Sequence, residues 1–113
     1  MEEGSVFEAA VERPGDRMAV VRVSGELDLL TAPELDAALK ALQEERADIE
    51  LDLSGLEFID STGVHLVLQI YQASRREGWD LVLSGASEEV RRAFELVGLL
   101  DRLPFRDRGQ SSS

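Results

Sequence analysis

Phe58-Ile59-Asp60-Ser61-Thr62-Gly63 is the most informative stretch of this chain. It lies between a strand-like run over residues 51–59 and a run with helical spacing that begins at Val64. The pattern predicts that Ser61 lies in the first turn of a helix, beside backbone N–H groups without partners inside that helix. Those donors and the helix dipole favour negative charge. Two interpretations follow: Ser61 carries a phosphate, or Ser61 caps the helix.

On both sides of this stretch, the sequence predicts strands that alternate with helices. A turn with Pro and Gly at residues 13–16 predicts that the first two strands form a hairpin. The alternation predicts an α/β fold with a largely parallel or mixed sheet covered by helices. We expect Ser24-Gly25 to end the second strand, and residues 103–105 are candidates for a short edge strand. The expected strands cover residues 6–11, 18–23, 49–54 and 80–84, and the expected helices begin at Thr31, after Gly63 and at Ser87.

Two of the expected helices carry clear sequence signals. The first opens with a threonine cap at Thr31, a proline at Pro33 and a glutamate at Glu34, which together predict a capping box. The helix after Gly63 is apolar over a wide arc, so we expect it to be mostly buried or to offer part of its surface to a partner. Its narrow polar strip consists of His65, Gln69 and Gln72.

The chain has 113 residues, of which 43% are hydrophobic, and this size fits one domain with its own core. We expect the domain to span residues 1–105 and the polar end, residues 106–113, to form a disordered tail. Cysteine is absent, which excludes disulfides and thiolate metal sites and suits a reducing compartment.

The formal net charge of −11 argues against direct binding to nucleic acid or to an anionic membrane surface, and it favours partners with a basic patch. No apolar stretch approaches the ~20 residues of a membrane span. The N-terminal residues, Met1 to Gly4, lack the basic and apolar regions of a signal peptide. We therefore expect a cytosolic protein, monomeric when free.

Enzyme motifs are missing: there is no P-loop, no dinucleotide-binding glycine fingerprint and no nucleophile elbow. His65 lies one turn from Ser61 and could reach its hydroxyl, but no oxyanion hole or orienting acid accompanies the pair. Lys40, the single lysine, lies too early in the chain for a phosphoaspartate receiver. We therefore assign no catalytic residue and no cofactor.

A metal site is conceivable where several acids lie near expected strand ends. The spacing of a calcium-binding loop is absent, and acids at such positions are more often solvated or capping. We predict no metal ion. The acids considered are Asp28, Asp52 and Asp60.

Four motifs, in order and at matching distances, resemble the STAS-domain family, and within it the bacterial anti-sigma-factor antagonists. Together they extend the resemblance over residues 5–105. The motif around Ser61 matches the phosphorylation motif of that family, and Asp28 matches the acidic residue close to its serine. The four motifs are Val23-Ser24-Gly25-Glu26-Leu27-Asp28, Leu51-Asp52-Leu53-Ser54-Gly55-Leu56, Phe58-Ile59-Asp60-Ser61-Thr62-Gly63 and Phe94-Glu95-Leu96-Val97-Gly98-Leu99.

The resemblance implies a mixed sheet of four to five strands with helices mainly on one face. It also implies a non-enzymatic partner switch. The unphosphorylated antagonist binds an anti-sigma factor with a serine-kinase fold and frees a sigma factor. That kinase phosphorylates Ser61 and ends the contact, and a metal-dependent serine/threonine phosphatase restores it. The partner-binding residues implied are Asp28, Asp60, Ser61, Thr62 and Gly63, with Thr62 a second possible acceptor.

A second hypothesis stays open. Some members of the family are fixed subunits of larger assemblies, such as lipid-transport or stress-sensing complexes. In that case Ser61 is only a helix cap, and the chain binds its neighbours constitutively.

Overall fold

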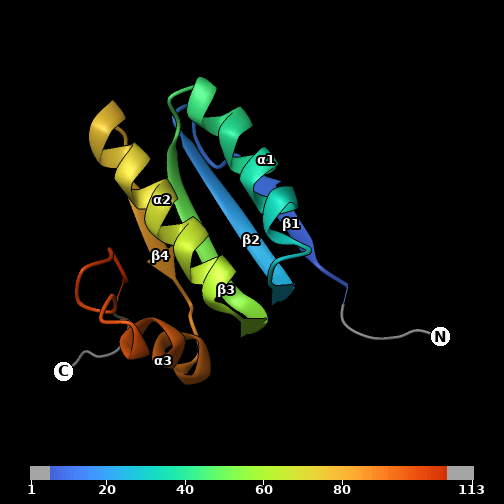
Figure 1. Cartoon of the computed structure of the whole chain (residues 1–113). Helices are drawn as coiled ribbons and strands as arrows, with labels where there is room; N and C mark the ends of the chain where they lie inside the picture. Colours follow the sequence, from blue (N-terminus) through green and yellow to red (C-terminus); the bar gives the residue numbers. More distant parts are fainter. Residues whose placement is uncertain (1–5, 107–113) are drawn as a thin grey trace.

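The computed structural model describes residues 6–106 and shows a sheet with two long helices over one face (Figure 1). Four strands and three helices alternate as the sequence predicts. They are β1 (Glu8–Glu12), β2 (Met18–Leu27), α1 (Ala32–Glu44), β3 (Asp48–Ile59), α2 (Ser61–Glu77), β4 (Leu81–Ser84) and α3 (Glu88–Leu96).

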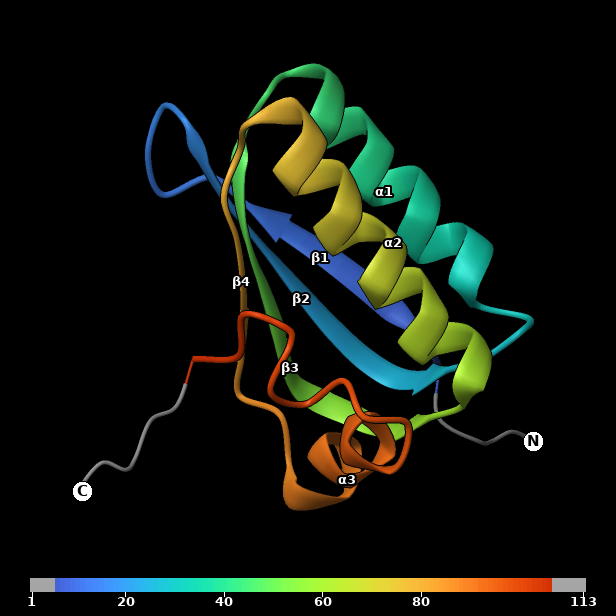
Figure 2. The same ribbon diagram turned by 60° about the vertical axis from the view of Figure 1, so that its left-hand side comes forward.

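The sheet is mixed, with strand order β1-β2-β3-β4. β1 and β2 form the predicted antiparallel hairpin, and β2, β3 and β4 are parallel. Both crossovers step in the same direction across the sheet, and right-handed crossovers of that kind place their helices on the same face. Figures 1 and 2 show α1 and α2 side by side on that face, with α3 beyond the ends of the parallel strands.

The core lies between the sheet and these two helices. Alternate residues of the strands point toward the helices, as in Leu51 and Leu53 of β3, which are fully buried. Leu35 and Leu39 of α1 and Val67 of α2 are fully buried and belong to the same apolar cluster. The intervening residues of β3, such as Glu50 and Asp52, are polar and lie on the face that α1 and α2 leave uncovered, where Val20 of β2 and Val82 of β4 also lie.

β2 does not end at Ser24-Gly25, as the sequence led us to expect, but continues to Leu27. Gly25 makes this possible because it takes a φ of 91°, which L-residues rarely adopt, between two shifts of register with β3. A Cβ at Gly25 would also lie 2.8 Å from the carbonyl oxygen of Val6. β3 reaches Ile59, where the strand-like run of residues 51–59 ends, so the two strands finish side by side.

The C-terminal segment does not form a fifth strand. Phe105 makes only an isolated parallel bridge with Leu83. Arg106, which the sequence assigned to the tail, is fixed by a bond from its N–H to the carbonyl of Leu83 at 2.7 Å and by a 3.4 Å ion pair with Glu50. The rest of the expected tail, residues 107–113, lies outside the described residues.

Candidate functional site

The site lies where the adjacent strands β2 and β3 end. Leu27 and Ile59 are paired, and the N–H of Asp60 donates to the carbonyl of Leu27 at 3.1 Å. Asp28 and Asp60 therefore follow directly on neighbouring strands, whose backbones lie about 4.8 Å apart. The two acids therefore lie at the same end of the sheet.

The cap of α2 is Asp60, not Ser61. The Asp60 carboxylate accepts a bond from the N–H of Gly63 at 3.1 Å, and its carbonyl accepts from Val64 at 3.0 Å. The interpretation of Ser61 as the helix cap is therefore wrong. Ser61 is the exposed first residue of α2. Within residues 6–106, the N–H groups of Ser61 and Thr62 have no hydrogen-bond acceptor, which leaves two donors beside the hydroxyl.

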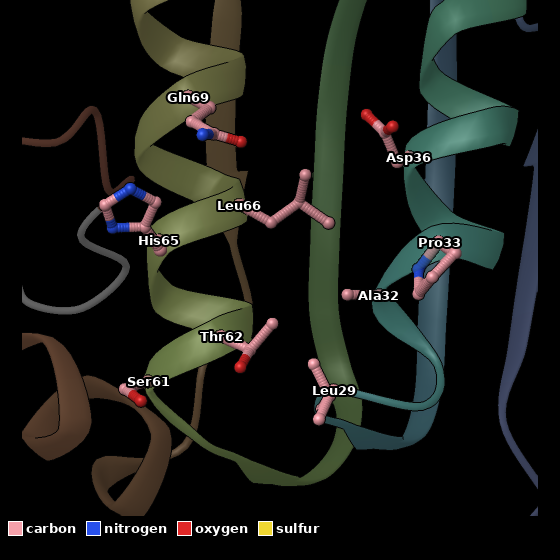
Figure 3. Close-up of a pocket in the computed structure, with 9 residues that line it drawn as sticks. All are labelled: Leu29, Ala32, Pro33, Asp36, Ser61, Thr62, His65, Leu66 and Gln69. Carbon is pink, nitrogen blue, oxygen red and sulfur yellow. The ribbon is translucent and has the colours of Figure 1, made fainter.

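Thr62 and Gly63 differ in their access to a partner. Thr62 is half-buried and points toward α1 in Figure 3. Gly63 is buried, and a Cβ there would lie 2.7 Å from Ile59 Cγ1 and 2.8 Å from Leu27 Cγ. Gly63 is thus buried in the free chain, and its contact with a partner stays a prediction. The residue lets the first turn of α2 pack against the ends of β2 and β3, which holds Ser61 in place.

Asp28 shapes the loop between β2 and α1. Its carboxylate accepts from the N–H groups of Leu30 at 3.0 Å and Thr31 at 3.2 Å. The Thr31 hydroxyl donates to the carbonyl of Glu26 at 2.7 Å, so its side chain closes this loop instead of forming the predicted capping box. The loop presents Leu29 and Leu30 to solvent, with exposed fractions of 69% and 86%.

Sequence reasoning missed the two leucines. Their signal was available, because two adjacent large apolar residues stand just outside both expected elements, between the expected second strand and Thr31. Isolated exposed apolar residues are ordinary, but an adjacent pair beside a candidate site suits a protein interface.

A shallow groove of about 640 Å³ runs between α1 and α2 and includes Ser61 (Figure 3). Its apolar part comes mainly from the facing sides of the two helices, and its polar part includes Asp36, which pairs with Lys40 at 3.3 Å. Figure 3 shows Ser61 and His65 on the side of α2 that faces away from α1. The lining residues are Leu29, Ala32, Pro33, Asp36, Ser61, Thr62, His65, Leu66 and Gln69.

A second group of exposed apolar side chains lies on and near α3. Phe58 is 48% exposed, Leu96 78% and Val97 56%. Phe58 shares a small hollow with Glu89 and Arg92. Exposed apolar residues therefore flank the site in space, on the side of α1 and on the side of α3.

The fold and this arrangement agree with comparisons to known proteins. The model of the STAS domain matches residues 9–111. The chain belongs to the STAS-domain family.

Relatives of this STAS domain carry consistent names. An anti-sigma-B factor antagonist of Staphylococcus aureus (strain NCTC 8325 / PS 47) is 34% identical over 87 residues, which are 76% of this chain and 81% of that protein. An anti-sigma factor antagonist from Mycobacterium paratuberculosis, solved by crystallography, is 30% identical, with a TM-score of 0.80 over 92% of this chain and 88% of that one. The Bacillus cell fate determinant SpoIIAA in its phosphorylated form is 25% identical, with a TM-score of 0.71 over 91% and 93%.

Asp52, one of the acids considered for a metal site, lies apart from the other two in this STAS domain. Its carboxylate accepts from the N–H of Ser54 at 2.9 Å and pairs with Arg22 at 3.3 Å, and Arg22 also pairs with Glu12. Burial raises the pKa of Asp52, but the Ser54 bond and the Arg22 cation outweigh it, so the pKa lies below its ordinary value. No three metal-ligating side chains gather anywhere in residues 6–106.

The described part of the STAS domain contains no helix with the length and apolar character to cross a bilayer. The arrangement closest to a catalytic set is Ser61 with His65 one turn later. Within residues 6–106, no acid is hydrogen-bonded to His65, so its imidazole lacks an orienting partner. What the site offers chemically is an exposed hydroxyl on a fixed turn, flanked by acids and apolar side chains.

Proposed function

We propose that the chain is an anti-sigma-factor antagonist controlled by phosphorylation of Ser61. Its unphosphorylated form binds an anti-sigma factor of serine-kinase fold, which releases a sigma factor. That kinase phosphorylates Ser61 and ends the contact, and a metal-dependent serine/threonine phosphatase restores it. The observation that carries this proposal is that Ser61 is exposed in the first turn of α2 while Asp60 supplies the cap.

The relatives support this proposal. The relatives from Staphylococcus aureus and Mycobacterium paratuberculosis are anti-sigma factor antagonists by name, and SpoIIAA has been solved in a phosphorylated form. The antagonist acts by binding, without an active site, cofactor or metal ion of its own. It works in the cytosol as a free monomer, its domain is the segment 1–105, and it makes no direct contact with nucleic acid.

The surface around Ser61 suits a protein partner. Leu29 and Leu30 supply apolar area, and Asp28, Asp60 and the half-buried Asp36 make its surroundings acidic. Such a surface fits a partner whose contact patch is apolar with basic residues around it. Thr62, half-buried at the groove, contributes the smaller part of the contact.

A phosphate on Ser61 would act mainly on the interface. Phosphoserine carries about −1.5 to −2 charges at neutral pH. Two unit charges ~6 Å apart repel by roughly 3 kcal/mol at an effective dielectric constant of ~20, and Asp28 and Asp60 already supply negative charge. Burial of the dianion against a partner adds a desolvation cost of several kcal/mol unless a cation meets it. A shift from mostly bound to mostly free requires on the order of 5 kcal/mol, which these two effects can supply.

The fold itself should tolerate the phosphate. The free N–H groups of Ser61 and Thr62 and the dipole of α2 attract negative charge, and the Asp60 cap does not use the Ser61 hydroxyl. The switch therefore needs no change of shape.

The test is an affinity capture from the native host with four baits: wild type, Ser61→Ala, Ser61→Asp and Gln72→Glu. The last adds a charge to an exposed site on α2 three turns away. The captured kinase-fold protein is then purified, and its dissociation constant is measured for each bait by calorimetry. We expect wild type, Ser61→Ala and Gln72→Glu to bind alike and Ser61→Asp to bind at least tenfold more weakly. Equal binding by all four would favour the alternative, a constitutive subunit of a larger assembly.

A further inference from the structure

His65 is a side chain at the site to which the proposed switch gives no role. It is exposed on α2, four residues after Ser61, and within residues 6–106 it makes no ion pair or hydrogen bond. The nearest charged residue across the groove, Asp36, already pairs with Lys40. The imidazole is therefore available to a group that appears only after modification.

His65 lies about one helical turn after Ser61 on α2. Residues four apart on a helix are neighbours, with Cβ atoms about 5–6 Å apart. In Figure 3 the imidazole is turned toward the following turn of α2, so it reaches the turn that holds Ser61 by rotation about its side-chain bonds. Figure 3 shows both side chains on the same side of α2, away from α1.

We infer that His65 contacts the phosphate of the switched-off form: its imidazole N–H donates to a phosphate oxygen on Ser61. Together with the free N–H groups of the first turn, this contact holds the phosphate along α2. The inference rests on the proposed phosphorylation of Ser61 and names the residue that receives the modification. It makes the stability of the phosphorylated form depend on a residue outside the phosphorylation motif.

Another cation could take this role, and the experiment must separate the two. Arg92 of α3 is exposed and shares a hollow with Phe58 and Ile59, just before Ser61. Gln69 lies on the same groove but eight residues after Ser61, about 12 Å along the helix, which is beyond the reach of the phosphate. Gln69→Ala therefore serves as the matched control for His65→Ala.

The experiment installs phosphoserine at position 61 during translation, so that no kinase is needed. Each background is then prepared with serine and with phosphoserine, and the melting temperatures of each pair are compared by calorimetry. The backgrounds are wild type, His65→Ala, His65→Lys, Gln69→Ala and Arg92→Ala. For each variant we subtract the melting temperature of the serine form from that of the phosphoserine form. The same difference in wild type is then subtracted from this value.

We expect phosphorylation to raise the melting temperature of His65→Ala by about 1–3 °C less than that of wild type, because one favourable pair at this spacing is lost. Gln69→Ala and Arg92→Ala should match wild type, and His65→Lys should restore the effect. In wild type, the imidazole nitrogen signals should shift on phosphorylation by NMR. An unchanged phosphorylation effect in His65→Ala, or its loss in Arg92→Ala instead, would overturn the inference.

Failure of the His65 contact and failure of the proposed switch give different results. If the phosphoserine chain bound its kinase-fold partner as tightly as the serine chain, the switch would fail while the His65 contact could stand. If the switch worked but His65→Ala left the effect of phosphorylation unchanged, only the contact would fail.

Discussion

The carboxylate of Asp60 accepts a hydrogen bond from the N–H of Gly63 at 3.1 Å, across the residue that carries the candidate hydroxyl. The helix end and the modification site are thus adjacent but separate. Loss of an N-cap costs about 1 kcal/mol. We expect Asp60→Ala to lower the free energy of unfolding by about that amount and Ser61→Ala to change it by less than about 0.5 kcal/mol. Urea unfolding of the two variants checks this, and a larger loss in Ser61→Ala would return the capping role to Ser61.

Gly63→Ala should destabilise the whole domain. The added Cβ would meet Ile59 and Leu27 at 2.7 and 2.8 Å, and overpacking of this kind costs about 1–3 kcal/mol. The matched control is Gly15→Ala, because a Cβ at Gly15 meets nothing within 4 Å. Thermal unfolding measures both. If the two variants melted at the same temperature, the tight approach of α2 to the strand ends would not hold in solution.

Leu30→Ser should weaken partner binding without weakening the fold. Leu30 is 86% exposed in the free chain, and a fully buried leucine contributes about 1.5–3 kcal/mol, so we expect a dissociation constant roughly tenfold or more higher. Val11→Ser serves as control, since Val11 is exposed on β1 toward the opposite end of the sheet. Calorimetric titration with the purified partner measures the dissociation constant of each variant. Equal losses in the two variants would remove the loop leucines from the interface.

Acid should reveal what the ionised Asp52 carboxylate contributes through its bond from Ser54 and its ion pair with Arg22. The pKa of Asp52 is lowered in the folded chain, so this residue adds stability that is present above its unfolded pKa of about 4 and is lost as the pH falls through the lower folded value. Asp52→Asn should therefore be less stable than wild type at pH 7, and the gap should close toward pH 2. Melting temperatures across this range test it, with Asp16→Asn, a change at an exposed turn, as control. A gap that stays constant with pH would show that ionisation of Asp52 is not involved.

Much of the fold could be predicted because its signals are local. Alternation along β3 and the apolar stripes of the helices depend on neighbours in sequence, and Ser87 caps α3 as expected through a 3.2 Å bond from Val90. The position of Ser61 in the first turn of a helix followed from the same signals and is confirmed.

The features that the sequence did not reveal depend on contacts between distant residues. β2 passes Gly25 because β3 lies beside it and offers partners as far as Leu27, which a glycine in sequence does not reveal. The burial of Gly63 depends on Leu27, thirty-six positions earlier in the chain. Arg106 is fixed by β4 and Glu50, although its local sequence is polar.

The bond from Asp60 to the carbonyl of Leu27 ties the end of β3 to the end of β2, and Gly63 seals α2 against both. The hydroxyl of Ser61 therefore lies on a surface that these contacts fix. Any protein that adds, detects or removes a phosphate must touch this same small area. Only one such protein can be there at a time, so kinase and phosphatase would compete for the chain, and the outcome would depend on their relative concentrations.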